Sequence, residues 1–215
     1  MDTKALFALA ETDDADALIA ALKPFPTTTP VRNEAGESLY EFSVFRGRTK
    51  CAEALKKRGP LSLHDAALAG DASRVAALLD TAPWAVDLLS PDGWTALHLA
   101  SFVGNDAVIV AILERGADAR VMSRAFETNM AMHAAAAGRR IGREAYTKLI
   151  KATGVDAMQK QGYTALMIAA SNGFKDGVEA LLACGADKSV KLADGKTAAD
   201  IAKDRGHAEI ESMLR

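Results

Sequence analysis

The sequence predicts an all-α solenoid of about seven stacked helix-turn-helix repeats, in which the first and last repeats act as caps. The first observation is a motif in three segments, GWTALHLASFVGN from Gly93, GYTALMIAASNGF from Gly162 and GKTAADIAKDRGH from Gly195. The second is that one position of this motif, here called the slot, has counterparts in four further segments. The seven slot residues are Phe7, Glu41, His64, His98, His133, Met167 and Asp200. Their spacings are 34, 23, 34, 35, 34 and 33 residues, so the repeat covers nearly the whole chain.

The third observation is a set of regularly placed glycines. In five units a glycine lies six residues after the slot, and in three of them another lies twelve residues further on. The first set is Gly47, Gly70, Gly104, Gly173 and Gly206, and the second is Gly59, Gly116 and Gly185. Glycine adopts the left-handed backbone conformation without a Cβ penalty, so each is expected to end a helix.

Unit four shows how one repeat is built. Residues 95–103 are predicted to form a short helix, with the Thr95 hydroxyl as N-cap and Gly104 after the last turn. A second helix is predicted from Asp106 to Arg115, because its apolar residues recur at helical spacing and Gly116 follows it. Each unit is therefore expected to be two antiparallel helices and a loop.

The TALH segment, the small alanines after it, the VIVAIL helix and the RGADA that follows together resemble the ankyrin repeat. The resemblance is strong in 93–119 and 162–188, good in units three and seven, and degenerate in units one, two and five. It implies a single ankyrin repeat domain over residues 1–215. Residues 1–59 would hold degenerate N-terminal repeats, and residues 60–215 regular repeats with a polar C-terminal cap.

Departures from the repeat locate irregular places. The spacing of 23 residues leaves no room for a hairpin loop at Gly59 and Pro60, so units one and two are predicted to tilt against the rest. In unit five the distance from His133 to the matching glycine, taken as Gly142, is nine residues and not six. This indicates an insertion between the two helices of that unit, within GRRIGR.

Composition limits the possible functions. Charges nearly balance, 26 Lys and Arg against 28 Asp and Glu, which gives a net charge of −2 and does not favour nucleic acid as partner. No segment is apolar enough to span a membrane or to act as a leader. Cys51 and Cys184 lie far apart without metal-ligand spacing, which fits a reducing, cytoplasmic location. Cys51 is expected in the core and Cys184 nearer the surface.

The sequence offers no catalytic, cofactor-binding or metal-binding residues. No nucleophile, zinc or phosphate-loop motif occurs. His64, His98 and His133 occupy the same slot of successive units, where stacked helices are about 8 to 10 Å apart, so they cannot share one zinc ion. Each imidazole, and His207 as well, is instead predicted to hydrogen-bond the backbone of a neighbouring repeat.

The ankyrin resemblance implies a non-catalytic, monomeric module that binds a protein partner of unknown identity through its concave face. By the same resemblance, the expected contact residues are Trp94, Phe102, Val103, Asn129, Arg139, Arg140, Tyr163, Ser171 and Asn172. Two alternatives stay open, a small enzyme or stress-response protein with a site in the repeat groove, and a nucleic-acid-binding regulator. The apolar members could also merely pack on neighbouring helices. Arginines concentrated in units four and five form either a solvated face or a surface for an acidic partner.

Overall fold

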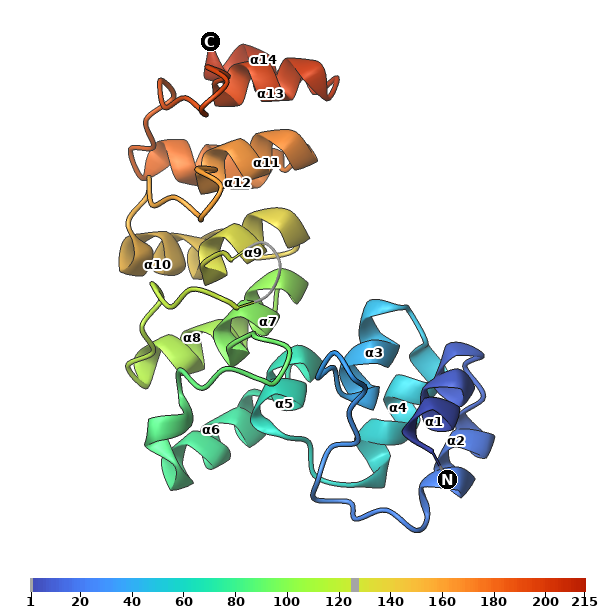
Figure 1. Cartoon of the computed structure of the whole chain (residues 1–215). Coiled ribbons are helices and arrows are strands. Elements are labelled where there is room, and N and C mark those ends of the chain that lie inside the picture. The colour runs from blue at the N-terminus through green and yellow to red at the C-terminus, as the bar shows by residue number, and fades with distance from the viewer. Residues whose placement is uncertain (1, 125–127) are drawn as a thin grey trace.

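The computed structural model describes residues 2–124 and 128–215, and in these ranges helices occur in seven antiparallel pairs (Figure 1). The first three pairs are α1 (Thr3–Glu11) with α2 (Ala15–Leu22), α3 (Leu39–Phe45) with α4 (Thr49–Arg58), and α5 (Leu63–Ala69) with α6 (Ala72–Thr81). A short 3-10 helix, η1 (Pro83–Ala85), follows α6. The other pairs are α7 (Ala96–Val103) with α8 (Asp106–Glu114), α9 (Ala131–Gly138) with α10 (Arg143–Thr153), α11 (Ala165–Asn172) with α12 (Lys175–Ala183), and α13 (Ala198–Asp204) with α14 (Ala208–Leu214). The predicted solenoid of about seven units is confirmed.

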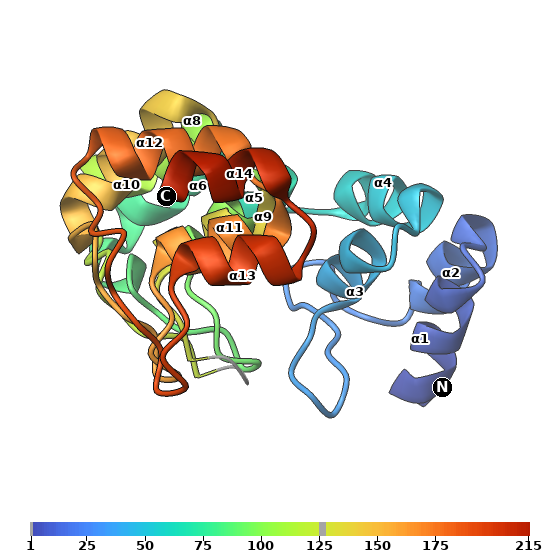
Figure 2. The same cartoon turned by 90° about the horizontal axis from the view of Figure 1, so that it is seen from above.

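Helices α5 to α14 form a regular stack, residues 63–215. The first helices of its five units lie one above another in one layer, and the second helices form the layer behind them (Figures 1 and 2). One continuous apolar core runs between the layers, from Ala66 near the base to Leu214 at the end of the chain. Small alanines line the first helices, so successive helices approach closely. The strongest example is Gly138 of α9, where any Cβ would collide with the Phe102 carbonyl oxygen of α7.

The local signals at helix ends act as the sequence predicts. The hydroxyls of Thr95 and Thr164 accept the backbone N–H groups three residues later, at the starts of α7 and α11. Gly104 and Gly173 end these helices with φ of 76° and 69°, a conformation that is easy for glycine and strained for other residues. Helix α8 ends one residue before the predicted Arg115.

Unit five corrects one prediction about the insertion. Arg139, and not a glycine, stands six residues after the slot and caps α9 in the left-handed conformation, with φ 59°. Gly142 is therefore not the equivalent of Gly104, because it lies in extended backbone just before α10. The additional residues, Arg140 and Ile141, follow the cap, and the buried Ile141 side chain holds this turn against the core.

The stack is interrupted between α4 and α5, as the missing hairpin predicts. Only residues 59–62 connect the two helices, and residues 2–58, here called the N-terminal arm, lie beside the base of the stack (Figures 1 and 2). The arm has its own apolar core around Leu6, Leu18 and Leu22. A small cluster, Tyr40, Ala52, Leu68 and Leu99, connects the arm to the stack.

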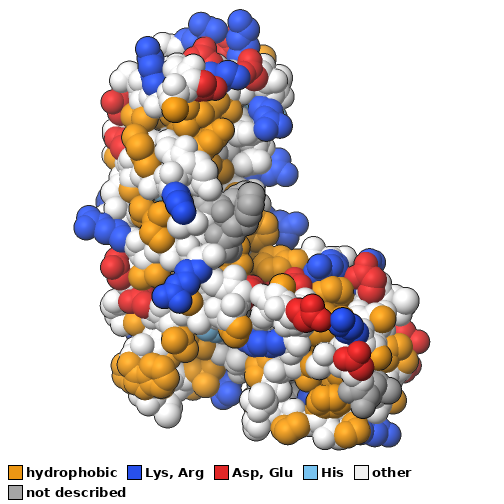
Figure 3. Space-filling view, viewed as in Figure 1, with side chains coloured by type: hydrophobic (Ala, Val, Ile, Leu, Met, Phe, Trp, Pro, Cys, Tyr) orange, Lys and Arg blue, Asp and Glu red, His pale blue; other side chains and the backbone are white. Residues whose placement is uncertain are grey.

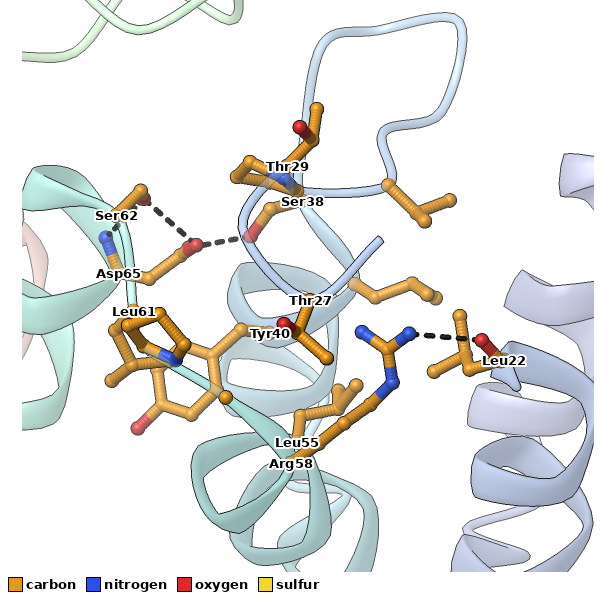
Figure 4. A pocket seen from close by; sticks show the side chains of 15 residues that line it. Leu22, Thr27, Thr29, Ser38, Tyr40, Leu55, Arg58, Leu61, Ser62 and Asp65 are labelled. Carbon is orange, nitrogen blue, oxygen red and sulfur yellow. Dashed lines mark hydrogen bonds between the residues drawn. The ribbon is translucent and has the colours of Figure 1, made fainter. Parts of the chain in front are cut away.

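Polar contacts surround a cavity of about 60 Å³ at this junction (Figure 4). Arg58 Nη2 donates to the carbonyl oxygens of Leu22 at 2.8 Å and Phe25 at 2.6 Å, which ties the end of α4 to the end of α2. Asp65 of α5 accepts from the hydroxyl of Ser38 at 2.5 Å and from that of Ser62 at 2.8 Å. These bonds satisfy the polar groups that the short connection buries.

Glu41 is a buried acid at the same junction, with only 1% of its surface exposed. Burial, and then the neighbouring Asp92 carboxylate, raise the pKa of Glu41 to about 8. Arg32 lies 4.0 Å away. Since the pKa is raised above its unfolded value, the folded protein holds a proton that the unfolded chain releases. The stability that Glu41 contributes is therefore complete below about pH 4.5 and is lost as the pH rises through 8.

Replacing Glu41 with Gln should remove this pH dependence. The variant should be more stable than the wild type at pH 9, by about 1 to 3 kcal/mol, because no carboxylate has to be buried. At pH 4.5 the two proteins should differ little. Urea unfolding at both pH values measures the difference, and a variant less stable than the wild type at pH 9 would contradict this account of the junction.

We also predict that residues 60–215 fold without the arm. Five stacked units exceed the three or so that a repeat protein needs, and the core of the stack is separate from that of the arm. The fragment should give the helical circular dichroism expected of its length and unfold in one cooperative urea transition. A fragment that lacks helical signal would show that the arm is required for folding.

Candidate functional site

An apolar pocket of about 360 Å³ opens in the angle between the N-terminal arm and the stack. Its lining, here called the aromatic pocket, is Phe45, Trp94, His98, Leu99 and Phe102. Phe45 and Phe102 are 40% and 41% exposed, and because the two rings are in contact their exposed apolar surface is contiguous. Figure 3 shows hydrophobic surface in this angle, with Lys and Arg side chains along the edge of the stack above it.

Ring contacts hold the pocket walls in place. The rings of Phe45 and Phe102 lie edge to face with centroids 5.7 Å apart, and Trp94 lies 5.8 Å from the ring of His98. Phe45 and Phe102 each follow their slot by four residues, which places each about one helical turn beyond it on the same face. The arm thus brings unit two against unit four. The equivalent residue of unit three, Leu68, is buried in the connecting cluster.

The structure brings together some of the residues predicted to contact a partner. Trp94 and Phe102 line the aromatic pocket, and Val103 is half-buried beside them in the connecting cluster. The prediction that Asn129 contacts a partner is corrected, because only 2% of its surface is exposed. The loop of unit five closes over the slot of unit four at this point, and the carbonyl of Asn129 accepts from the His98 ring.

Arg139 and Arg140 are both exposed at the turn between α9 and α10. Arg139 Nη1 donates to the carbonyl of Asn172 at 2.8 Å, which joins this turn to the end of α11. Ser171 and Asn172 are half-buried there. Tyr163 is also half-buried, but it packs against the core of the stack and does not line the aromatic pocket.

Two exposed aromatic residues escaped the sequence analysis. Phe45 could have been found from its register, since it stands four residues after Glu41 as Phe102 does after His98. The tilt that brings the two rings together leaves no local signal. Trp84 of η1, the short helix after α6, is 76% exposed, and no repeated position marks it.

The slot histidines form backbone hydrogen bonds between repeats, as predicted. The Nε2–H groups of His64, His98 and His133 donate to the carbonyls of Leu88, Asn129 and Ala157 at 2.9, 2.8 and 3.0 Å. His207 makes a longer bond of 3.2 Å to the carbonyl of Ser171. At His98 the Thr95 hydroxyl lies 2.7 Å from Nδ1, so both ring nitrogens have partners.

Burial lowers the pKa of His98 and of His133 to about 4, so both rings are neutral at pH 7. Their roles are structural, since their Nε2 atoms are engaged by carbonyl groups. Across residues 2–124 and 128–215, no three His, Cys, Asp or Glu side chains converge on a point that could hold a metal ion.

The remaining side chains that could take part in chemistry are also at least partly buried or hydrogen-bonded within the fold. Cys51 is fully buried, as expected, and burial raises the pKa of its thiol to about 11, which disfavours the nucleophilic thiolate. Cys184 is half-buried and therefore nearer the surface than Cys51, as expected. At the junction cavity, Asp65 and Arg58 are held by the hydrogen bonds described above, and burial raises the pKa of Tyr40 to about 12.

Comparison with protein-family models gives matches over the regular part of the stack. A model of three ankyrin repeats matches residues 111–192 and 131–215, and a single-repeat model matches 92–124. Together they cover residues 92–215, more than half of the chain. The chain belongs to the ankyrin repeat family. Ankyrin repeats are generally protein–protein interaction modules, and they are typically non-catalytic. Among the described helices of this ankyrin repeat protein, none has the length and apolar character needed to cross a bilayer.

The hydrogen bonds of His98 generate a stability prediction. Replacing His98 with Ala should lower the free energy of unfolding at pH 7 by about 1 to 3 kcal/mol, because the Asn129 carbonyl loses its donor inside the protein. A depressed pKa means that the stabilising effect of the neutral ring is complete above pH 6.5 and is lost as the pH falls through 4. The difference in unfolding free energy between the variant and the wild type should therefore become smaller as the pH is lowered.

Urea unfolding at pH 7 and pH 4.5 measures this difference. His98→Met is a matched control, since Met167 fills the same slot in unit six. It keeps the apolar volume but provides no donor, so it should lose stability too. Full stability of both variants at pH 7 would contradict the proposed role of the ring.

Proposed function

We propose that this protein is a non-catalytic module that binds a protein partner through the concave side of the stack, and that the aromatic pocket is the centre of the contact. The observation that carries the proposal is the exposed pair Phe45 and Phe102, which, with Trp94, forms an apolar cavity open to solvent. Buried aromatic anchors in a central pocket provide most of the binding energy at many protein interfaces.

The geometry favours this function over the two alternatives. An enzyme needs titratable groups that converge with a nucleophile or an acid and base, whereas the aromatic pocket contains one histidine whose ring nitrogens are engaged by Thr95 and Asn129. A nucleic-acid binder needs a basic stripe, and the net charge here is −2. A preformed apolar pocket is better suited to bind an apolar side chain of a protein partner than to catalyse a reaction or to bind nucleic acid.

Substitution of Phe45 or Trp94 by Ala tests the proposal. A partner captured from native lysate and identified by mass spectrometry should bind each variant more weakly by about 2 kcal/mol, or roughly 30-fold in Kd, if these side chains are anchors. Circular dichroism and thermal melting should show that each variant is folded before its binding is compared.

Trp84→Ala is the matched control, because it removes an aromatic ring that is more exposed than either but lies outside the pocket. It should bind like the wild type. The proposal fails if Trp84→Ala loses the partner while Phe45→Ala and Trp94→Ala retain it, and the binding surface would then lie at η1.

A further inference from the structure

A second cavity, of about 410 Å³, lies one repeat above the aromatic pocket, at the turn edge of the stack. Its charged lining residues are Arg139, Arg140, Lys175 and Asp176, which give three positive charges against one negative. Lys175 is paired with Glu209 of α14. In the part of the chain that the structure describes, neither arginine has an acidic side chain within ion-pair distance, so the uncompensated charge belongs to Arg139 and Arg140.

The two cavities are neighbours through direct backbone contact. The Cα of Gly138, which lines the basic cavity, sits against the carbonyl of Phe102, which lines the aromatic pocket. The backbone of Arg140 in turn packs against Gly104, where a Cβ would come within 2.3 Å of its carbonyl oxygen. The end of α7 therefore contacts both the aromatic pocket, through Phe102, and the arginine turn, through Gly104.

The conformation of Arg139 indicates that its side chain is positioned at a cost. Gly70, Gly104 and Gly173 fill the equivalent left-handed position in other units, while Arg139 adopts φ 59° as a residue with a Cβ. Strained backbone of this kind is concentrated at functional sites. One N–H of the guanidinium is used by the Asn172 carbonyl, so the group is oriented and still has donors for a carboxylate.

We propose that these two cavities together bind an extended acidic peptide segment, with an aromatic or leucine side chain in the aromatic pocket and a flanking Asp or Glu on Arg139 and Arg140. This inference rests on the proposed function, and it adds the chemistry of the partner. Charge complementarity selects the acidic residue, because among the described residues neither Arg139 nor Arg140 has an acidic partner, and the turn that carries them packs against the end of α7. An isolated arginine pair at one turn suits a carboxylate on a peptide better than the phosphates of a long nucleic acid.

Selection from a library of random 12-residue peptides displayed on phage tests this inference directly. The whole chain is immobilised in three forms: the wild type, the double variant Arg139→Gln and Arg140→Glu, and the control Lys188→Glu. Lys188 is an exposed lysine on the loop after α12, so the control reverses a charge away from both cavities. Circular dichroism verifies the folding of each protein.

On the wild type and on Lys188→Glu, selected peptides should be enriched in an aromatic or leucine residue accompanied by Asp or Glu. On the double variant the apolar preference should remain, while the enrichment of Asp and Glu falls at least tenfold. On Phe45→Ala the apolar preference should fall and the acidic preference remain.

The outcomes separate this inference from the proposed function. Selected peptides with an apolar anchor but no acidic bias, or an acidic bias that survives in the double variant, would overturn the inference and leave the proposed function standing. A wild type that selects no peptides above an empty surface would overturn both.

Discussion

The four-residue connection between α4 and α5 is the constraint on which the rest of the molecule depends. A regular repeat would place a hairpin loop there and let α3 and α4 continue the stack. Residues 59–62 are too few for this, so the arm lies beside the stack, with Arg58 tied back to α2 and Asp65 tied to Ser38. The aromatic pocket exists because this arrangement brings α3 against α7. The aromatic pocket is thus a product of an irregular repeat.

The stack itself is maintained by a different and repeated interaction. Each slot histidine is buried and neutral, and its Nε2–H donates to a carbonyl of a neighbouring loop. Burying an imidazole is favourable only when it is satisfied in this way. The same interaction explains why His98 can line the aromatic pocket without offering a free ring nitrogen to a ligand. Both of its ring nitrogens are hydrogen-bonded, to the Thr95 hydroxyl and the Asn129 carbonyl, so the ring contributes only its shape to the pocket lining.

Local features of this fold could be predicted from the sequence because they depend on nearby residues. Thr95 and Gly104 determine where α7 begins and ends, and the slot spacing predicts both the pairs of helices and the interruption after Gly59. The errors have physical causes as well. Gly142 was taken as a helix cap because a glycine was expected there, whereas Arg139 adopts the left-handed conformation instead. Asn129 was assigned to the surface by its register, but the loop of unit five is buried at that position.

The site was harder to predict than the fold because it is assembled from two units that are not consecutive. Trp94 and Phe102 could be predicted from the repeat register. Phe45 meets them only because the N-terminal arm tilts in one particular direction. The slot spacing predicts that the stack is interrupted after α4, but it does not predict the direction in which the arm tilts. The most direct test of the account is therefore the contact between Phe45 and Phe102 in solution. With selectively labelled phenylalanine, NMR should show nuclear Overhauser effects between the two rings, as their edge-to-face packing at 5.7 Å requires. Assigned ring resonances without any effect between them would show that the arm does not close the pocket, and would contradict the account.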